Sequence, residues 1–261
     1  MLEQIVMAGL AIAIVMLLLW VVQLRTRDAG VVDVAWSAAI GLVAIYYAVT
    51  SPGDPTRRLL LAIVAPFWGL RLALYLLANR VLGKQEDGRY SRLREKWGPR
   101  AQLNFLLFFE FQAALVVLFS LPALAVAYNP SAGLNGWDIA GAVLLLASVL
   151  GESAADRQLA AFRANRANRG RTCRNGLWRF SRHPNYFFEW LHWWAYVLLG
   201  IGSPLWWMTL AGPLLMWIFL FKITGIPATE EQALATRGED YRRYQATTSQ
   251  FIPWFPREEK P

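Results

Sequence analysis

The chain alternates between long apolar stretches and shorter polar segments. Seven apolar stretches are long enough to cross the roughly 30 Å hydrocarbon core of a bilayer as helices. They lie at about residues 3–23, 31–50, 59–80, 104–128, 137–155, 186–202 and 204–223, and the last two meet at Ser203-Pro204 as a tight hairpin. The pattern therefore predicts an all-α, polytopic membrane protein with seven transmembrane helices in a single domain over residues 1–261.

The first apolar stretch resembles a secretory signal only superficially. It carries Glu3, has no basic segment before the apolar run, and is not followed by a small-residue cleavage site. We therefore expect it to remain as a transmembrane helix.

Composition agrees with a membrane protein and excludes other classes. Hydrophobic residues make up 56% of the chain and charged residues 17%, against about 25% charged residues in soluble domains. This excludes intrinsic disorder, and the single cysteine, Cys173, excludes a disulfide-stabilised scaffold. Two histidines and one cysteine, without acidic pairs close by, predict no metal site.

Basic residues indicate the orientation in the membrane. Of the 26 Lys and Arg residues, all except Arg57, Arg58 and Arg71 follow the first, third, fifth or seventh stretch. Because basic loops remain on the cytoplasmic side, the N-terminus is predicted outside and the C-terminus in the cytoplasm. Topology thus explains the net charge of +8, and we expect no nucleic-acid partner.

Ionisable side chains within the apolar stretches are costly and therefore informative. They are Asp33, Arg71, Glu110, Glu152, Glu189 and His192. Together with Tyr75, Asn79, Asp156 and Asn185, most of them fall in the cytoplasmic half of the predicted bundle. This common depth predicts a polar cavity that opens to the cytoplasm. The alternative is a set of salt bridges that only hold the helices together, with Asp33 or Glu110 paired to Arg71.

The segment 157–182 contains eight arginines and no lysine, with asparagines between them and glycines at 170 and 176. Arginine binds phosphate in a bidentate manner, and asparagine amides can bind a ribose or a base. The composition therefore favours a dinucleotide ligand over the alternative, contact with anionic lipid headgroups. Neither G-x-G-x-x-G after a strand nor a P-loop motif is present, so helices and loops would bind the nucleotide.

Next comes the sequence RHPNY, which opens the sixth predicted helix. Pro184 marks the helix start, and Asn185 is predicted to be its N-cap. His183 is expected to contact the nucleotide or to pack, whereas His192, among several tryptophans, is expected to be a core residue.

The C-terminal tail, 225–261, is predicted to form a short amphipathic cytoplasmic helix followed by an apolar end. Phe251, Ile252, Trp254 and Phe255 are expected to dock on the bundle at the membrane interface. There the tail would act either as a lid over the cavity or as a passive anchor.

Several motifs resemble one family. They are VVDVAWS, WGLRLALYLLANRVLGKQEDGRY, ADRQLAAFR, RNGLWRFSRHPNYFFEWLHWW and FIPWFP. Over about residues 31–256 the chain resembles the steroid 5-alpha-reductase family and its bacterial relatives. The resemblance implies a multi-pass protein, in a bacterium one of the inner membrane, that binds NADPH from the cytoplasm. It also implies reduction of the carbon–carbon double bond of a 3-oxo-4-ene steroid or a similar enone lipid.

The resemblance assigns cofactor-binding roles to residues of the third, fifth and sixth helices and the arginine segment. The predicted cofactor-binding residues are Arg71, Tyr75, Asn79, Glu152, Asp156, Arg163, Arg171, Arg179, Arg182, His183, Asn185, Tyr186, Glu189 and Trp193. Glu152 occupies a position where the family's reductases can have an amide.

The substrate end departs from the family pattern. There, a Glu on the second helix and a Tyr at the start of the third polarise the ketone, whereas here the matching positions are Asp33 and about Trp68. Because tryptophan is not an acid, we predict Asp33 and Tyr75 as catalytic residues. Trp36, Trp68 and Glu110 are the predicted substrate-binding residues. A donor aimed at the ketone oxygen would act when negative charge develops there.

Two other functions remain open. Membrane methyltransferases that use S-adenosylmethionine, of the isoprenylcysteine or phospholipid type, share the RHPNY-plus-Glu signature, but they need little phosphate recognition. A lipid-binding or transport protein without enzymatic activity is the third possibility, although the internal repeats typical of transporters are absent.

Overall fold

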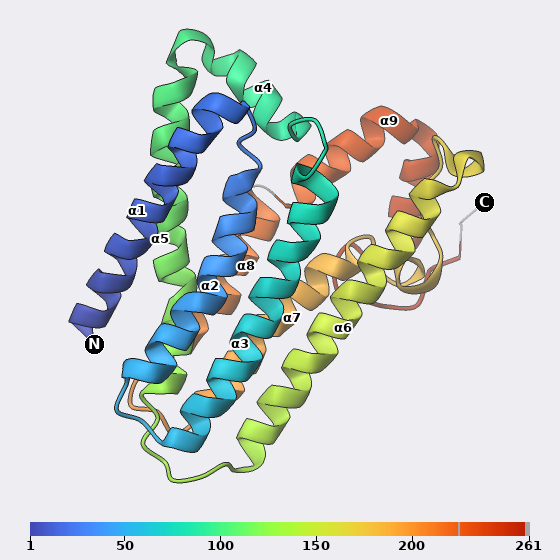
Figure 1. Cartoon of the computed structure of the whole chain (residues 1–261). Helices are drawn as coiled ribbons and strands as arrows, with labels where there is room; N and C mark the ends of the chain where they lie inside the picture. The colour runs from blue at the N-terminus through green and yellow to red at the C-terminus, as the bar shows by residue number, and fades with distance from the viewer. Residues whose placement is uncertain (224, 259–261) are drawn as a thin grey trace. The chain divides into compact units, whose positions relative to one another are not determined.

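A computed structural model describes residues 1–223 and 225–258, and this part of the chain is helical without strands (Figure 1). The α-helices are α1 (Leu2–Thr26), α2 (Val31–Thr50), α3 (Pro55–Leu76), α4 (Gly88–Trp97), α5 (Ala101–Ala127), α6 (Gly136–Ala164), α7 (Pro184–Leu199), α8 (Ala211–Ile218) and α9 (Ile226–Thr247). The predicted tail helix is therefore α9, and the last three residues of the predicted tail lie outside the described residues.

Six helical stretches of the described chain are long and apolar enough to cross a membrane. They are Leu2–Thr26, Val31–Thr50, Pro55–Val81, Gly88–Ala127, Gly136–Ala164 and Trp206–Thr247. The remaining predicted span, 186–202, corresponds to α7, whose 16 residues are fewer than the roughly 20 that a perpendicular helix needs. These helices make the chain a polytopic membrane protein.

Charge separates α9 from the apolar stretch that precedes it. Seven of its 22 residues are charged, namely Glu230, Glu231, Arg237, Glu239, Asp240, Arg242 and Arg243. Because charges are costly in hydrocarbon, α9 lies outside the membrane-spanning part.

The chain forms two compact units. The first unit contains Met1–Asn135 and Gly200–Gly212, and the second contains Gly136–Leu199 and Pro213–Pro261. Each unit has its own packing, and the two are described separately below.

In the first unit, α1, α2, α3 and α5 run side by side and α4 crosses one end of them (Figure 1). Two glycines bring α2 and α3 together. A Cβ atom on Gly69 would lie 2.6 Å from the backbone oxygen of Ser37, and one on Gly41 would lie 2.9 Å from the Cα atom of Pro66. Small residues at such contacts let membrane helices approach closely. The contact places the first turns of α2 beside the second half of α3.

The start of α3 differs from the prediction. The helix begins at Pro55, four residues before the apolar stretch, because Asp54 caps it by accepting hydrogen bonds from the backbone of Thr56 and Arg57. Arg57 is buried, and its Nε donates to the backbone oxygen of Ser131 at 2.9 Å. A proline in the first helical position after an aspartate cap is the usual helix start.

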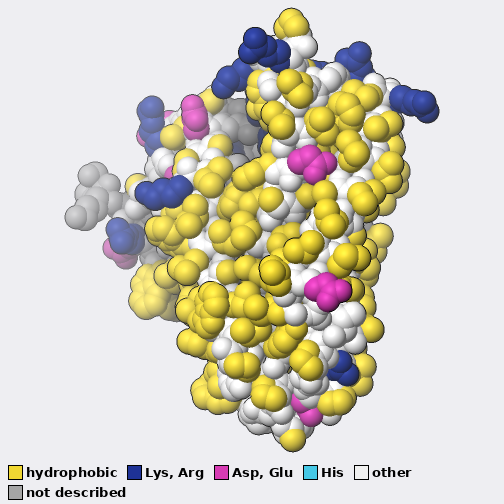
Figure 2. Space-filling view, turned by 90° about the vertical axis from the view of Figure 1, so that its left-hand side faces the viewer, with side chains coloured by type: hydrophobic (Ala, Val, Ile, Leu, Met, Phe, Trp, Pro, Cys, Tyr) yellow, Lys and Arg dark blue, Asp and Glu magenta, His cyan; other side chains and the backbone are white. Residues whose placement is uncertain are grey.

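The outer side of α1 is apolar. Leu10, Ile14 and Leu18 are each more than half exposed. Hydrophobic side chains cover most of the face shown in Figure 2, whereas Lys and Arg lie mainly towards its margins. Lipid, rather than protein, is the environment that suits this surface.

In the second unit, α6 packs along α7 through glycines. A Cβ atom on Gly141 would lie 2.7 Å from Leu199 Cγ, and one on Gly151 would lie 2.5 Å from the ring of Phe188. The segment between the two helices is fixed to both α6 and α9. Trp178 Nε1 donates to the backbone oxygen of Ala155 at 2.9 Å, and the buried Tyr244 hydroxyl donates to the backbone oxygen of Ser181 at 3.0 Å.

Candidate functional site

The predicted site residues are distributed between the two units. The first unit holds Asp33, Trp36, Trp68, Arg71, Tyr75, Asn79 and Glu110. The second unit holds Glu152, Asp156, Arg163, Arg171, Arg179, Arg182, His183, Asn185, Tyr186, Glu189 and Trp193.

Asp33, in the first turn of α2, is bound to α4. Its Oδ2 lies 2.8 Å from Arg89 Nη2, and its Oδ1 accepts a hydrogen bond from the Tyr90 hydroxyl at 2.7 Å. Asp33 therefore forms an ion pair with Arg89, a partner that was not considered from the sequence. Arg89 and Tyr90 end the family-like motif WGLRLALYLLANRVLGKQEDGRY, but neither was a predicted site residue.

Asp87 adds a second acid to this cluster. It caps α4 and accepts hydrogen bonds from both the backbone and the side chain of Arg89. Burial alone would raise the pKa of Asp87, but these hydrogen bonds and the charge of Arg89 hold it below its ordinary value. Arg89 is thus shared by two carboxylates at the polar end of the first unit.

Trp36 lies one turn further along α2 than Asp33. Its ring meets Phe119 edge-on, with centroids 5.5 Å apart. Its Nε1 atom is buried and has no hydrogen-bond partner among the described residues. A buried N–H without an acceptor is unfavourable, so the oxygen of a ligand would suit this position.

The other predicted substrate residues differ in exposure. Trp68 is fully buried in α3. Glu110 is half-buried on the side of α5 that also carries the exposed Leu103 and Leu107. The side chain of Glu110 forms neither a hydrogen bond nor an ion pair within the described chain.

The end of α3 widens into a π-helical turn, Leu77–Val81. Arg71, Tyr75 and Asn79 follow one another at four-residue intervals on one face, and Asn79 Nδ2 donates to the Tyr75 backbone oxygen at 2.8 Å. Asn79 also lines an open pocket of about 220 Å³ with Arg80 and Lys84. Neither of these two basic residues was a predicted site residue, although π-turns often mark functional sites.

In the second unit, two of the segment's arginines are held by α9. Arg182 Nε lies 2.7 Å from Glu230 Oε1, and its Nη1 donates to the backbone oxygens of Gln245 and Thr248. Arg174 Nη2 lies 3.1 Å from Asp240 Oδ1. Both arginines therefore fasten the segment to α9.

The three other predicted arginines, Arg163, Arg171 and Arg179, are exposed. None of them forms an ion pair within the described residues. Arg163 lies in the last turn of α6, and two glycines with positive φ, Gly170 at 77° and Gly176 at 58°, shape the loop that follows. These guanidinium groups remain available for a ligand.

Asp240 of α9 anchors the loop. Asp240 accepts a hydrogen bond from the Thr172 backbone N–H at 2.7 Å as well as the ion pair from Arg174. Burial alone would raise the pKa of Asp240, but these contacts hold it below its ordinary value. Asp240 was not among the predicted site residues.

The predicted residues of α6 and α7 meet at one point. Asn185 Nδ2 donates to Asp156 Oδ1 at 3.3 Å, and Asn185 Oδ1 is buried without a partner among the described residues. Glu189 and Trp193 follow Asn185 at four-residue intervals on α7, while Glu152 lies one turn before Asp156 on α6. At this α6–α7 contact the amide of Asn185 thus binds an acid through its nitrogen and presents its oxygen as an unfilled acceptor.

Asn185 is not the N-cap of α7, contrary to the prediction. The helix begins at Pro184, and the His183 backbone oxygen accepts the first helical hydrogen bond, from Phe187, at 3.0 Å. Proline suits the first helical position because it lacks an N–H group. The side chain of Asn185 is therefore free to face α6.

His183 has a packing role. It is 2% exposed, its ring stacks on Tyr186 with centroids 5.5 Å apart, and its Nε2 lies 3.2 Å from Glu230 Oε1. Tyr186 in turn shares a hydrogen bond with Thr229 of α9 at 3.3 Å. Burial lowers the pKa of His183 and so favours the neutral ring.

The apolar end of the tail packs through Phe251 and, at the surface, Phe255. Phe251 is buried against Phe187, Trp190 and Phe221. The ring of Phe255 is 75% exposed but meets Phe180 edge-on, with centroids 6.0 Å apart. Ile252 and Trp254 are 60% and 69% exposed, so the prediction that all four side chains dock was wrong for these two.

The comparison with known proteins covers nearly all of these residues. No curated protein and no solved structure matches the chain. One family matches residues 19–248, a range that includes every predicted site residue of both units. The chain therefore belongs to the family described as "Protein of unknown function (DUF1295)".

Proposed function

We propose that this protein is an NADPH-dependent reductase of the steroid 5-alpha-reductase type. Its substrate would be a 3-oxo-4-ene steroid or a similar enone lipid taken from the membrane. In this proposal seven helices span a bacterial inner membrane, with the N-terminus outside and the cofactor site open to the cytoplasm. The observation that carries the proposal is the group of exposed arginines around a glycine-shaped loop, Arg163, Arg171 and Arg179 among them, that lack acidic partners within the described chain.

The second unit has the groups that a dinucleotide needs. Arg163, Arg171 and Arg179 are available to phosphate oxygens, which they would bind in bidentate fashion. The buried, unpaired Asn185 Oδ1 is an acceptor that fits the amide of a nicotinamide or the amino group of an adenine. These groups suit the phosphates and the amide or base of a dinucleotide.

The first unit offers complementary groups. Asn79, Arg80, Lys84 and Asp87 line a pocket in which Arg80 is paired with Asp87, so Lys84 is the charge that a phosphate would neutralise. Arg71 and Tyr75 precede this pocket along the same face of α3. Tyr75 is the proposed second catalytic residue, and its phenol can donate a hydrogen bond.

Reduction of the enone would take a hydride at its β-carbon, which NADPH supplies when bound, and a proton from solvent at its α-carbon. The chain's own residues would stabilise the charge that then develops on the ketone oxygen. Trp36 Nε1 is a buried donor without a partner among the described residues. Asp33, the other proposed group, lies one turn away, where Arg89 and Tyr90 hold its carboxyl group in place.

Cofactor preference tests the proposal directly. NADPH at about 100 times its Kd should stabilise the purified protein by about 2.7 kcal/mol and raise Tm by several degrees. NADH should stabilise it less, because the number of available arginines exceeds what a diphosphate alone requires. The measurement is a thermal-shift comparison of NADPH, NADH and S-adenosylmethionine. A shift with S-adenosylmethionine alone would replace the reductase proposal by the methyltransferase alternative.

Loss of one loop arginine tests the site. Arg171→Ala should weaken NADPH binding roughly 10- to 100-fold, because it removes a charge-assisted hydrogen bond worth about 1.5–3 kcal/mol. The protein should keep its Tm, since Arg171 is exposed. Equilibrium binding of NADPH by the purified variant is the measurement.

Arg174→Ala is the matched control in the same loop. It removes the same charge, but Arg174 is paired with Asp240, so NADPH affinity should change less. Unchanged affinity in Arg171→Ala, or equal losses in both variants, would argue against a specific phosphate contact.

A further inference from the structure

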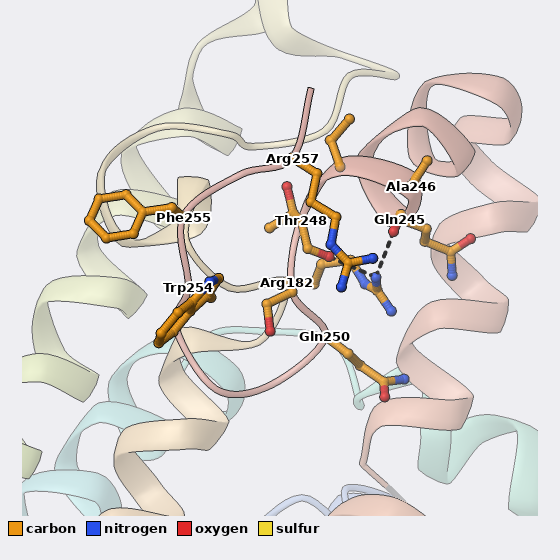
Figure 3. Close-up of a pocket in the computed structure, with 10 residues that line it drawn as sticks. Arg182, Gln245, Ala246, Thr248, Gln250, Trp254, Phe255 and Arg257 are labelled. Carbon is orange, nitrogen blue, oxygen red and sulfur yellow. Dashed lines mark hydrogen bonds between the residues drawn. The ribbon is translucent and has the colours of Figure 1, made fainter. Parts of the chain in front are cut away.

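A pocket lies between the end of α9 and the closing segment of the chain, within the second unit (Figure 3). Its cavity volume is about 290 Å³. The residues that matter for its chemistry are Arg182, Gln245, Thr248, Gln250, Trp254 and Arg257. The cofactor proposal does not account for this pocket, because Arg182 is its only member among the predicted cofactor residues.

The pocket has a positive character. Within the part of the chain that the structure describes, no acidic residue lines it. Arg182 is neutralised by Glu230, whereas Arg257 is exposed and has no ion pair among the residues described. Figure 3 shows both guanidinium groups in the centre of the view, with the amides of Gln245 and Gln250 at one side. Arg257 is therefore the charge that an anion would neutralise.

Hydrogen bonds hold the backbone around the pocket. The Arg257 N–H donates to the Thr247 oxygen at 2.8 Å, and the Trp254 N–H donates to the Phe180 oxygen at 2.9 Å. Ser249 Oγ donates to the Ile252 oxygen at 2.6 Å. These contacts and the buried Phe251 fix the segment that carries Arg257, so the pocket is formed before a ligand arrives.

The rim of the pocket is apolar and exposed. Trp254 and Phe255 line it, and both side chains are more than two-thirds exposed. Aromatic side chains beside basic ones are typical of the membrane–water interface, where rings lie at the level of the lipid headgroups. A soluble anion would leave these rings in water, whereas a lipid would cover them.

We propose that this pocket binds the phosphate of an anionic phospholipid, with Arg257 as its charged ligand and Trp254 and Phe255 against the lipid. Arginine suits a phosphate diester because its guanidinium group can donate two parallel hydrogen bonds. The amides of Gln245 and Gln250 can donate to the remaining headgroup oxygens. The proposal is independent of the reductase activity.

The test uses the full chain, purified in a non-ionic detergent. Binding of dioctanoylphosphatidylglycerol, dioctanoylphosphatidylcholine and inorganic phosphate is measured by microscale thermophoresis. We expect saturable binding that is tightest for dioctanoylphosphatidylglycerol. Arg257→Gln should weaken that binding about tenfold, which corresponds to the loss of one charge-assisted contact. Arg257→Lys, which keeps the charge but not the bidentate geometry, should have an intermediate affinity.

Arg243→Gln is the matched control. Arg243 lies on α9, is also exposed and does not line the pocket, so this substitution removes the same charge elsewhere. It should leave the lipid affinity unchanged. Equal losses in the Arg243 and Arg257 variants, or no loss in Arg257→Gln, would overturn the proposal. Inorganic phosphate binding as tightly as dioctanoylphosphatidylglycerol would assign the pocket to a soluble anion instead.

NADPH affinity separates this pocket from the proposed cofactor site. Arg257→Gln should bind NADPH with the affinity of the unmodified protein. If the unmodified protein does not bind NADPH, the reductase proposal fails, but the lipid affinities of the variants still test the pocket. A loss of NADPH affinity in this variant, with lipid binding retained, would assign Arg257 to the nucleotide and overturn the lipid proposal.

Discussion

Asp33→Asn is expected to lower kcat for enone reduction by about 100-fold or more while NADPH affinity is retained. The substitution keeps the size of the side chain and removes the acid. An amide still donates weakly, so Asp33→Leu should be worse than Asp33→Asn. The measurement is steady-state reduction of a 3-keto-4-ene steroid with NADPH, together with the Tm of each variant.

The contacts of Asp33 define the competing explanation. Its carboxylate accepts from Arg89 and Tyr90, so Asp33 could serve only to hold α4 against α2. In that case Asp33→Asn and Arg89→Gln should both lower Tm, and the double variant should recover part of the loss. Full reductase activity in a stable Asp33→Leu protein would remove Asp33 from the catalytic residues and direct attention to Tyr75.

Glu230→Gln is expected to lower the free energy of unfolding by about 3–5 kcal/mol, because it leaves Arg182 buried without its counter-charge. The side chains of Arg182 and Glu230 are only 10% and 12% exposed. Glu230 also accepts hydrogen bonds from Gln245 Nε2 at 2.9 Å and, more weakly, from the Tyr241 hydroxyl at 3.4 Å. Thermal unfolding should show a fall in Tm of roughly 10 °C.

Glu231→Gln is the adjacent control, since Glu231 is exposed and forms no ion pair within the described part of the chain. Its Tm should change by only about a degree or two, as for most surface substitutions. Equal Tm changes in the two variants would show that the buried pair contributes no more than a surface charge.

The pH dependence of Tm should also depend on the ion pair between Arg182 and Glu230. Burial alone would raise the pKa of Glu230, but hydrogen bonds from His183 and Arg182 and the charge of Arg182 lower it to about 2. An acid whose pKa is lowered in the folded state stabilises that state at pH values above its ordinary pKa. This contribution disappears as the pH falls towards 2. The Tm of the unmodified protein should therefore fall between about pH 4.5 and 2, and Glu230→Gln should lack this component.

The sequence by itself determined the class of protein and most helix positions. Apolar length is a local property, so α2 coincides with its predicted stretch at 31–50. Helix ends were less predictable where a polar residue or a proline begins the helix. Asp54 and Pro55 start α3 before its apolar part, and Pro184 starts α7 so that Asn185 is not the cap.

Only the tertiary structure decided which charges pair. Asp33 and Arg89 are 56 residues apart, and Arg182 and Glu230 are 48 residues apart. The sequence showed that such residues needed partners, because an unpaired charge near the membrane is costly. It could not show which partner, since pairing depends on which helix faces meet, and these are set by packing between distant segments. For the same physical reason, the eight arginines of the segment 157–182 looked alike in sequence. Only their contacts separated Arg174 and Arg182, which α9 holds, from the six exposed arginines that include Arg163, Arg171 and Arg179 and remain available to a ligand.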